Sequence, residues 1–283
     1  MVEGFIVRPL RCNHCGKELP VMGRFVAFQC GTCFNHWVLT SDGLKPVHIF
    51  RVSYESKSQE DVSLLPFWVI EVDLGKLRSS MESSFEELCV SAQTILQTRI
   101  TPEQEEPEFE ILPQGKPGID KGLLKAQFLV EASKKRKFPS SAEFNHLIGR
   151  LEEKGRFFVY VPAFLSFNTY AYLKIGRLLT KLQPTFGVEK SGDRGGGVLC
   201  AMQADEAVSL MDFIFLAILP DSIQSYGDLL EKIHLTPVGR PQLIEFPFVR
   251  QGAYLVSKVG GFQISKRLIE GLDGYHAPEH TTA

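Results

Sequence analysis

Apolar stretches recur along the chain, and their periodicities predict both strands and helices. Nearly continuous apolar runs, which are typical of buried strands, occur at residues 64–74, 156–164, 243–248 and 254–256. Apolar residues at helical spacing occur at residues 77–99, 120–132, 140–154 and 168–183. This mixture predicts an α+β fold class, in which a mixed α/β body makes up most of the chain.

Three of the strand segments share an apolar residue, a proline and an aromatic residue. The prolines are Pro66, Pro162 and Pro247. We predict that each stands at the head of its strand, because the first residue of a strand need not donate a hydrogen bond to the ladder. The spacing of the segments also indicates a degenerate internal repeat of about 85–95 residues.

Shorter strand-like segments occur near the N-terminus, at residues 25–28 and 36–40. Ser41, Asp42 and Gly43 form a turn sequence that joins the second of these segments to residues 44–50. These features predict β-hairpins in a small N-terminal module, which we place at residues 1–50.

Four of the six cysteines lie in this module as two CxxC pairs, which are Cys12, Cys15, Cys30 and Cys33. The 14 residues from Gly16 to Gln29 separate the pairs, which is close to the spacing of zinc sites. A two-residue gap lets a tight turn bring both sulfurs to one side of a metal ion. Gly16 suits the turn after the first pair, and Gly31 lies inside the second pair, where backbone approaches the metal. We therefore predict one Zn²⁺ ion held by four thiolates.

A site of four thiolates has no open coordination position, so the predicted zinc has a structural and not a catalytic role. The alternative, a redox-active dithiol, requires a CxxC pair at the start of a helix, and neither pair precedes one in the predicted pattern. His14 and His36 lie close to the cysteines in sequence. Because four cysteines already complete a zinc site, we interpret both histidines as bystanders.

The cysteine pairs and the strands around them resemble the zinc-ribbon fold group over residues 5–50. This resemblance implies a metal and a fold but no single function, because such ribbons occur in transcription factors, ribosomal proteins, polymerase subunits and many proteins of unknown role. A ribbon followed by the strand Leu64–Trp68 also resembles certain uncharacterised bacterial proteins, some of them membrane-attached. That similarity implies no activity.

Charge and composition narrow the range of partners. The net charge is −2 and the sequence pI is 6.4, so the chain as a whole has no basic excess for nucleic acid or an anionic membrane. The N-terminus has no secretory signal, and the longest apolar runs fall short of the roughly 20 residues that span a bilayer. We therefore expect a cytoplasmic protein without a transmembrane segment. Peripheral membrane contact stays open.

The domain organisation that we predict has four parts. A zinc ribbon at residues 1–50 precedes a strand–helix segment at 51–100, and residues 101–118 form an acidic, proline-rich linker or loop. The rest of the α/β body follows at 119–283 and ends in a flexible tail at about 274–283. The body also contains a run of four basic residues, Lys134, Lys135, Arg136 and Lys137.

Sequence motifs for catalysis are missing. The chain contains no phosphate-binding loop, nucleophile elbow or HExxH helix. Our first hypothesis is therefore a non-enzymatic intracellular adaptor or assembly component, whose ribbon and proline–phenylalanine strands meet protein partners. The alternative is a nucleic-acid-binding or transcription-related regulator that uses the ribbon or Lys134–Lys137. An enzyme with its site in the C-terminal body is the third hypothesis.

Overall fold

The computed structural model describes residues 9–20, 24–55, 60–77, 141–153, 155–166, 168–191, 200–219 and 233–275. The helix predicted at 120–132, the acidic segment 101–118 and the run Lys134–Lys137 lie outside these residues. So does the helix predicted at 77–99, apart from its first residue, which ends a helical stretch at residues 74–77. The description below covers the remaining parts of the chain.

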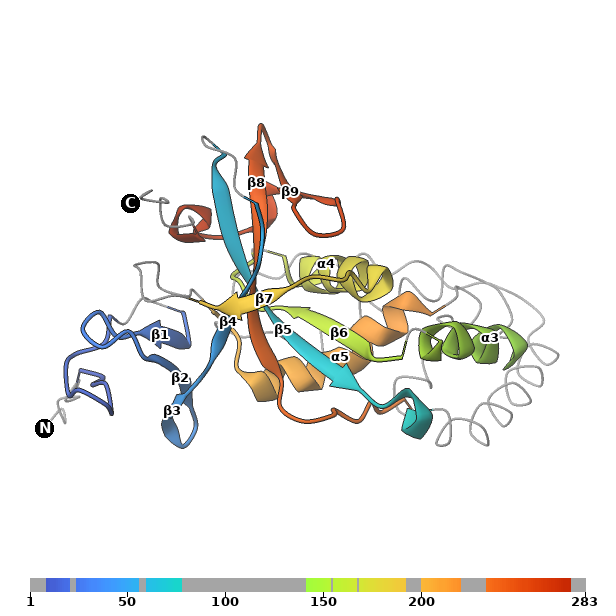
Figure 1. The fold of residues 1–283 in the computed structure, drawn as a ribbon, viewed down its shortest axis with the longest axis horizontal. Helices are drawn as coiled ribbons and strands as arrows, with labels where there is room; N and C mark the ends of the chain where they lie inside the picture. The colour runs from blue at the N-terminus through green and yellow to red at the C-terminus, as the bar shows by residue number, and fades with distance from the viewer. Residues whose placement is uncertain are drawn as a thin grey trace, which may run out of the picture.

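The N-terminal residues form a small antiparallel sheet, drawn in blue in Figure 1. Its strands are β1 (Ala27–Gln29), β2 (His36–Thr40) and β3 (Gly43–Pro46). The predicted turn joins β2 to β3, with Gly43 at φ +107° and Thr40 Oγ1 donating to the Gly43 carbonyl at 2.9 Å. We call residues 9–20 and 24–46 the cysteine module. Its sheet ends at Pro46, a few residues before the predicted boundary at residue 50.

A larger mixed sheet forms the centre of the body (Figure 1). Its strands are β4 (Ile49–Val52), β5 (Val62–Val72), β6 (Phe157–Pro162), β7 (Val188–Lys190), β8 (Gln242–Gln251), β9 (Tyr254–Ser257) and β10 (Gln263–Ser265). β5 pairs antiparallel with β6 on one side and β8 on the other. Two strands pair with the edge of β8 that faces away from β5. The first part of this edge pairs with β4, which is parallel to β8, and the last part pairs with β9, which forms a hairpin with β8.

The helices α3 (Ser141–Glu152), α4 (Thr169–Leu182) and α5 (Ala204–Ile218) belong to the body, and the short 3₁₀ helices η1 (Lys266–Leu268) and η2 (Leu272–Tyr275) follow the last strand. Successive side chains of β5 point to opposite faces of the sheet. Trp68 and Ile70 pack in one apolar cluster with α5 residues such as Phe215. Phe67 packs in the other cluster, with its ring 5.1 Å from that of Phe246 on β8. Because both faces are covered, β5 is buried along almost its whole length.

Side chains of α4 occupy the outer edge of β6, where a further strand would otherwise pair. Thr180 Oγ1 accepts a hydrogen bond from the Tyr160 backbone N–H at 3.0 Å. The Gln183 carboxamide accepts from the Phe158 N–H at 3.0 Å and donates to the Phe158 carbonyl at 2.6 Å. Gln183 therefore pairs with Phe158 as a residue of a neighbouring strand would, and this edge is closed.

The three prolines do not stand at strand heads, as the pattern predicted. Pro66 and Pro247 lie inside β5 and β8, and Pro162 is the last residue of β6. The Pro66 carbonyl accepts from the Ala163 N–H at 2.9 Å, just past the end of β6. The Pro247 carbonyl accepts from the Lys258 N–H at 3.0 Å, where the neighbour of β8 changes from β4 to β9. Each ring nitrogen thus faces a position where the neighbouring strand begins or ends, so the missing donor breaks no continuous ladder.

These proline segments lie side by side on β6, β5 and β8. Whether they derive from a repeat stays a prediction. Tyr275, which the prediction placed in the flexible tail, is 3% exposed, and its hydroxyl accepts from the Leu165 N–H at 3.0 Å. Within the described residues, the helices are too short or too polar to cross a membrane.

Candidate metal centre

The four predicted cysteines come together at one end of the cysteine module. Their Sγ atoms all lie within 4.8 Å of one another, and the shortest separations join Cys12 to Cys33 (3.5 Å) and Cys15 to Cys30 (3.4 Å). A disulfide would place its two sulfurs about 2.05 Å apart, so all four thiols are free. Four sulfurs on a tetrahedral metal at about 2.3 Å would lie about 3.8 Å apart. The cluster is therefore consistent with one metal ion at its centre.

Each CxxC pair folds into the same tight turn. In the first turn the Cys12 N–H donates to the Lys17 carbonyl and the Gly16 N–H donates to the Cys12 carbonyl, both at 2.8 Å. In the second turn the Cys30 N–H donates to the Asn35 carbonyl and the Phe34 N–H to the Cys30 carbonyl, both at 2.9 Å. The repeated pattern brings both sulfurs of a pair to the same side of the backbone.

The residue after each pair has a left-handed backbone. Gly16, with φ +74°, fills this position in the first turn, as the sequence predicted. Phe34, with φ +56°, fills it in the second turn. Gly31 therefore does not take the strained position of its turn, and a Cβ atom built on it would have no other atom within 4 Å. A phenylalanine tolerates φ > 0 far less well than glycine, so the second turn carries local strain.

Backbone amides around the cluster favour ionised sulfur. Burial opposes ionisation of Cys12, but the amides of Cys15 and His14 and the Cys33 thiol outweigh it and lower the pKa of Cys12 to about 6. The pKa of Cys30 is also lowered, because amides of its own turn outweigh its burial. At Cys15 the Lys17 amide favours the thiolate, yet burial and the other thiols raise its pKa to about 12. A divalent cation would remove this competition by stabilising all four thiolates.

Apolar and polar neighbours complete the surroundings of the sulfurs. Leu19, Phe28 and Trp37 form a small buried cluster with Cys12 and Cys30, which limits the access of water. The Asn35 side-chain amide lies 3.4 Å from the Cys33 sulfur and donates a hydrogen bond to it. We did not single out Asn35 from the sequence, although its place two residues after a CxxC cysteine was the available signal.

The two neighbouring histidines, which we interpreted as bystanders from the sequence, do not belong to the group of possible metal ligands. His14 is exposed, and His36 is half-buried at the start of β2. Within the described residues, the group of possible metal ligands at binding distance consists of the four cysteines alone.

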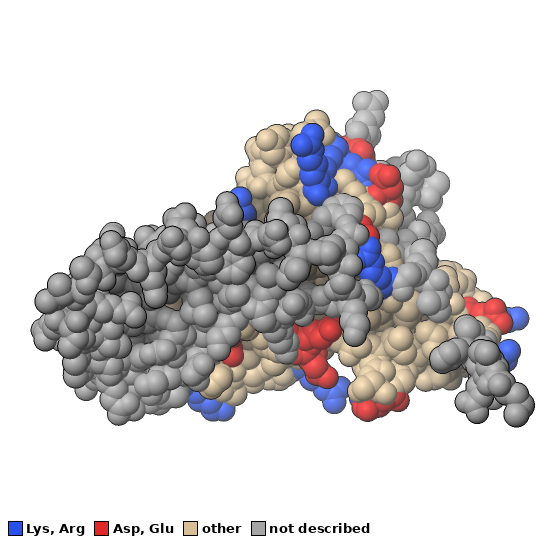
Figure 2. All heavy atoms as spheres, turned by 180° about the vertical axis from the view of Figure 1, so that it is seen from behind, with Lys and Arg blue, Asp and Glu red and all other residues tan. Residues whose placement is uncertain are grey.

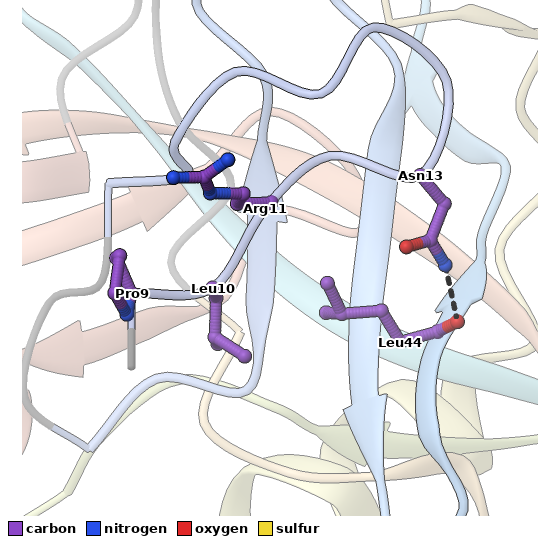
Figure 3. A pocket seen from close by; sticks show the side chains of 5 residues that line it. All are labelled: Pro9, Leu10, Arg11, Asn13 and Leu44. Atoms are coloured by element: carbon purple, nitrogen blue, oxygen red, sulfur yellow. Dashed lines mark hydrogen bonds between the residues drawn. The ribbon is translucent and has the colours of Figure 1, made fainter. Parts of the chain in front are cut away.

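An open hollow of about 600 Å³ lies on the cysteine module beside the first turn (Figure 3). Its lining residues are Pro9, Leu10, Arg11, Asn13 and Leu44. The Asn13 side-chain amide donates to the Leu44 carbonyl at 3.3 Å, and the Leu44 side chain extends from β3 toward Leu10. Arg11 is exposed and has no ion-pair partner among the described residues. The hollow thus combines apolar side chains with an exposed cation.

A buried ionic cluster in the body was not predicted. On neighbouring strands β4 and β8, Arg51 Nη2 and Nε lie 2.8 Å and 3.0 Å from Glu245 Oε2. Ser191 Oγ donates to the same oxygen at 3.1 Å. Glu245 is buried and 15% of the Arg51 side chain is exposed, so the cluster holds β4 to β8 and leaves little room for a ligand. Glu245 is the single charge in the apolar run 243–248, which was the available signal.

Charge on the visible surface of the body is mixed. On the face that Figure 2 shows, the Lys and Arg atoms of the described residues lie between or beside Asp and Glu atoms. A surface for nucleic acid usually carries a continuous basic stripe. This face therefore adds no support to nucleic-acid binding.

Comparison with protein-family models, with curated proteins and with solved structures found no match for this chain.

Proposed function

We propose that the cysteine module is a zinc ribbon that holds one structural Zn²⁺ ion through Cys12, Cys15, Cys30 and Cys33. An all-thiolate, tetrahedral set of ligands is typical of zinc or iron–sulfur chemistry, and paired turns on β-hairpins suit a single zinc ion. Support comes from the sulfur separations and from the matched backbone turns. Four protein ligands leave no position for water or substrate, so the metal would have no catalytic role.

We further propose that the chain is a non-enzymatic adaptor of the cytoplasm, and that the ribbon binds its protein partner. The observation that carries this proposal is the hollow beside the metal turn, in which Leu10 and Leu44 provide apolar contacts and Arg11 an exposed charge. Interface centres commonly combine apolar anchors with arginine. A ribbon fixed by a metal would present such a surface without an ordering cost on binding.

The proline–phenylalanine strands do not contribute to this partner surface. Phe67, Phe164, Phe246 and Phe248 are each 0% exposed, because they pack together in one apolar cluster. The phenylalanines of these strands were expected to be exposed, and this part of the expectation is wrong. The partner surface that we propose is confined to the ribbon.

Site-specific photocrosslinking tests this proposal. A photoreactive residue at exposed Asn13 should crosslink one defined protein in cells that contain the native partner, and the same residue at Val238, which is 47% exposed on the body, should not. Arg11→Glu should reduce the crosslink at position 13, because it reverses the charge at the hollow. Equal yields at both positions, or no product at position 13, would contradict the proposal. A crosslink to nucleic acid would favour the regulatory alternative instead.

A further inference from the structure

The cysteine module is tied to the body through the strand that leads to the second metal turn. Val26 lies just before β1, and Ala27 is its first residue. Their backbone N–H groups both donate to the Cys200 carbonyl, at 2.7 Å and 3.3 Å respectively. Ala27 is 2% exposed and belongs to the same apolar cluster as Cys200 and Trp68 of the body. The module thus closes one end of the core of the body.

Two further contacts lie just before this strand. Arg24 forms an ion pair with Glu270. The ring of Phe25 meets that of Tyr275 edge to face, with centroids 6.3 Å apart. Residues 24–27 therefore contact both the segment around Cys200 and the C-terminal η2 region.

Cys200 lies directly beneath these contacts. Its side chain is 0% exposed, and its thiol donates to the Met202 carbonyl at 3.1 Å. The Trp68 indole N–H donates to the same carbonyl at 2.8 Å. The next residue, Ala201, donates its N–H to the Ala163 carbonyl at 2.6 Å, which anchors this segment to the end of β6. The body thus fixes the Cys200 side of the contact, and β1 with the residue before it binds the Cys200 carbonyl.

The position of β1 depends on the metal turn. β1 ends at Gln29, the residue before the ligand Cys30, and pairs only with β2, which begins shortly after Cys33. A module of this size has too small an apolar core to stay folded without its metal. Loss of the metal would release Cys30 and Cys33. The pairing of β1 with β2 would then no longer be held in register. The body sheet has its own core and needs no ligand.

We infer that metal occupancy of the four-cysteine centre controls access to Cys200, with β1 and the residues before it acting as a metal-dependent cover. With metal bound, the cover is in place and the thiol is inert. Without metal, the cover opens locally and the thiol becomes available for modification. This inference rests on the proposal that the centre binds a metal. It does not depend on the partner of the ribbon.

Thiol labelling of the full chain with a maleimide, followed by peptide mapping, tests the inference. The chain should carry Cys89→Ser, so that Cys200 is the one thiol outside the metal centre. Zinc content is measured first by elemental analysis, so that absence of metal is recognised as failure of the proposed function. A zinc chelator should then raise the labelling rate of Cys200 roughly 10- to 100-fold, because local opening replaces rarer global unfolding. Added Zn²⁺ should restore the slow rate.

A second pair of variants separates the cover from the metal. Arg24→Glu opposes Glu270 and should speed labelling of Cys200 while zinc content stays at one per chain. Arg240→Glu makes the same charge change at an exposed position of the body, away from the metal turns, and should label like the parent. The inference is overturned if chelation exposes the four ligand thiols but leaves Cys200 unreactive. It is also overturned if chelation removes hydrogen-exchange protection from β5 and β8, because the metal would then support the whole fold.

Discussion

Single residues distinguish the two metal turns, although their backbone hydrogen bonds match. The left-handed position is filled by Gly16 in one turn and by Phe34 in the other. Glycine adopts such a backbone without steric cost, whereas phenylalanine places its Cβ against the following carbonyl. The Phe34 side chain is 39% exposed, so its own burial offsets little of this strain.

Phe34→Gly should therefore stabilise the metal-loaded protein, by about 1 kcal/mol, because it removes the left-handed strain of a bulky residue. Urea unfolding followed by circular dichroism measures the change. The matched variant Gly16→Ala should lower stability by a similar amount, since it introduces the same strain in the first turn. A lower midpoint for Phe34→Gly would mean that the aromatic ring contributes more than the strain costs.

Cys30→Ser should abolish metal binding, because a serine hydroxyl does not ionise to replace the buried thiolate at neutral pH. Elemental analysis should give about one zinc per chain for the parent and less than about 0.1 for the variant. Cys200→Ser changes a thiol in the body and should keep the full zinc content. Retention of zinc by Cys30→Ser would show that three cysteines suffice or that another residue replaces the fourth.

Helix side chains accept hydrogen bonds from backbone N–H groups that strand pairing leaves without a partner. The β6 edge ends on side chains of α4, and Thr180 supplies the acceptor for the buried Tyr160 N–H. Thr180 is itself 0% exposed, so no water can replace it. At the other end of the body, Asp212 of α5 accepts from the Leu235 N–H at 2.9 Å and thereby connects α5 to the segment before β8.

Thr180→Val should destabilise the protein by about 1–3 kcal/mol, because it leaves the buried Tyr160 N–H without an acceptor while preserving the side-chain volume. Urea unfolding gives the free energy, and hydrogen exchange of the Tyr160 amide locates the effect. Thr185→Val, at an exposed position shortly after α4, should be close to neutral. Equal effects of the two variants would argue against an edge that depends on Thr180.

Asp212 should make the stability of the protein fall as the pH rises from about 4 toward neutrality. Burial raises the pKa of Asp212 above its usual 3.8, against the Leu235 N–H and His234, which both favour the carboxylate. Because the folded-state pKa is the higher one, the folded state binds the proton more tightly, and this advantage is lost as the pH rises through that pKa. Asp212→Asn keeps an acceptor for Leu235 and should lack this component. The change in the urea midpoint from pH 4 to pH 7 should therefore be more positive in the variant than in the parent.

At the scale of the whole molecule, long-range contacts join parts that are far apart in sequence. The Arg51–Glu245 pair connects the strand that follows the cysteine module to the central strand β8. Glu245 is buried and Arg51 is partly exposed, so the Glu245 carboxylate is the charge that would be costly without its partner. The pair therefore serves the register of β4 against β8 more than the net stability.

Arg51→Met alone should cost about 3–5 kcal/mol, because it leaves the buried Glu245 carboxylate without its partner. Glu245→Leu alone should cost less, because the Arg51 guanidinium is partly exposed to water. The double variant should recover most of this loss, because no unpaired charge remains. Chemical unfolding of the four proteins forms a double-mutant cycle that measures the coupling. Lys45→Met, which breaks an exposed pair with Asp42, serves as a control that should leave the midpoint unchanged. Additive effects at Arg51 and Glu245 would contradict a paired role.

The sequence by itself determined the local features of this protein. Metal-ligand candidates, the turn at Ser41–Gly43, and the strands and helices at residues 64–74, 140–154 and 156–164 all follow from neighbouring residues, because turn geometry and side-chain periodicity act over a few positions. The tertiary structure alone decided how these parts meet. Pro66 and Pro247 are tolerated inside strands because neighbouring strands happen to end there, and the phenylalanines are buried because they pack together in one apolar cluster. The pairing of Arg51 with Glu245, and of β1 with Cys200, joins residues more than a hundred positions apart, where no sequence period carries the information.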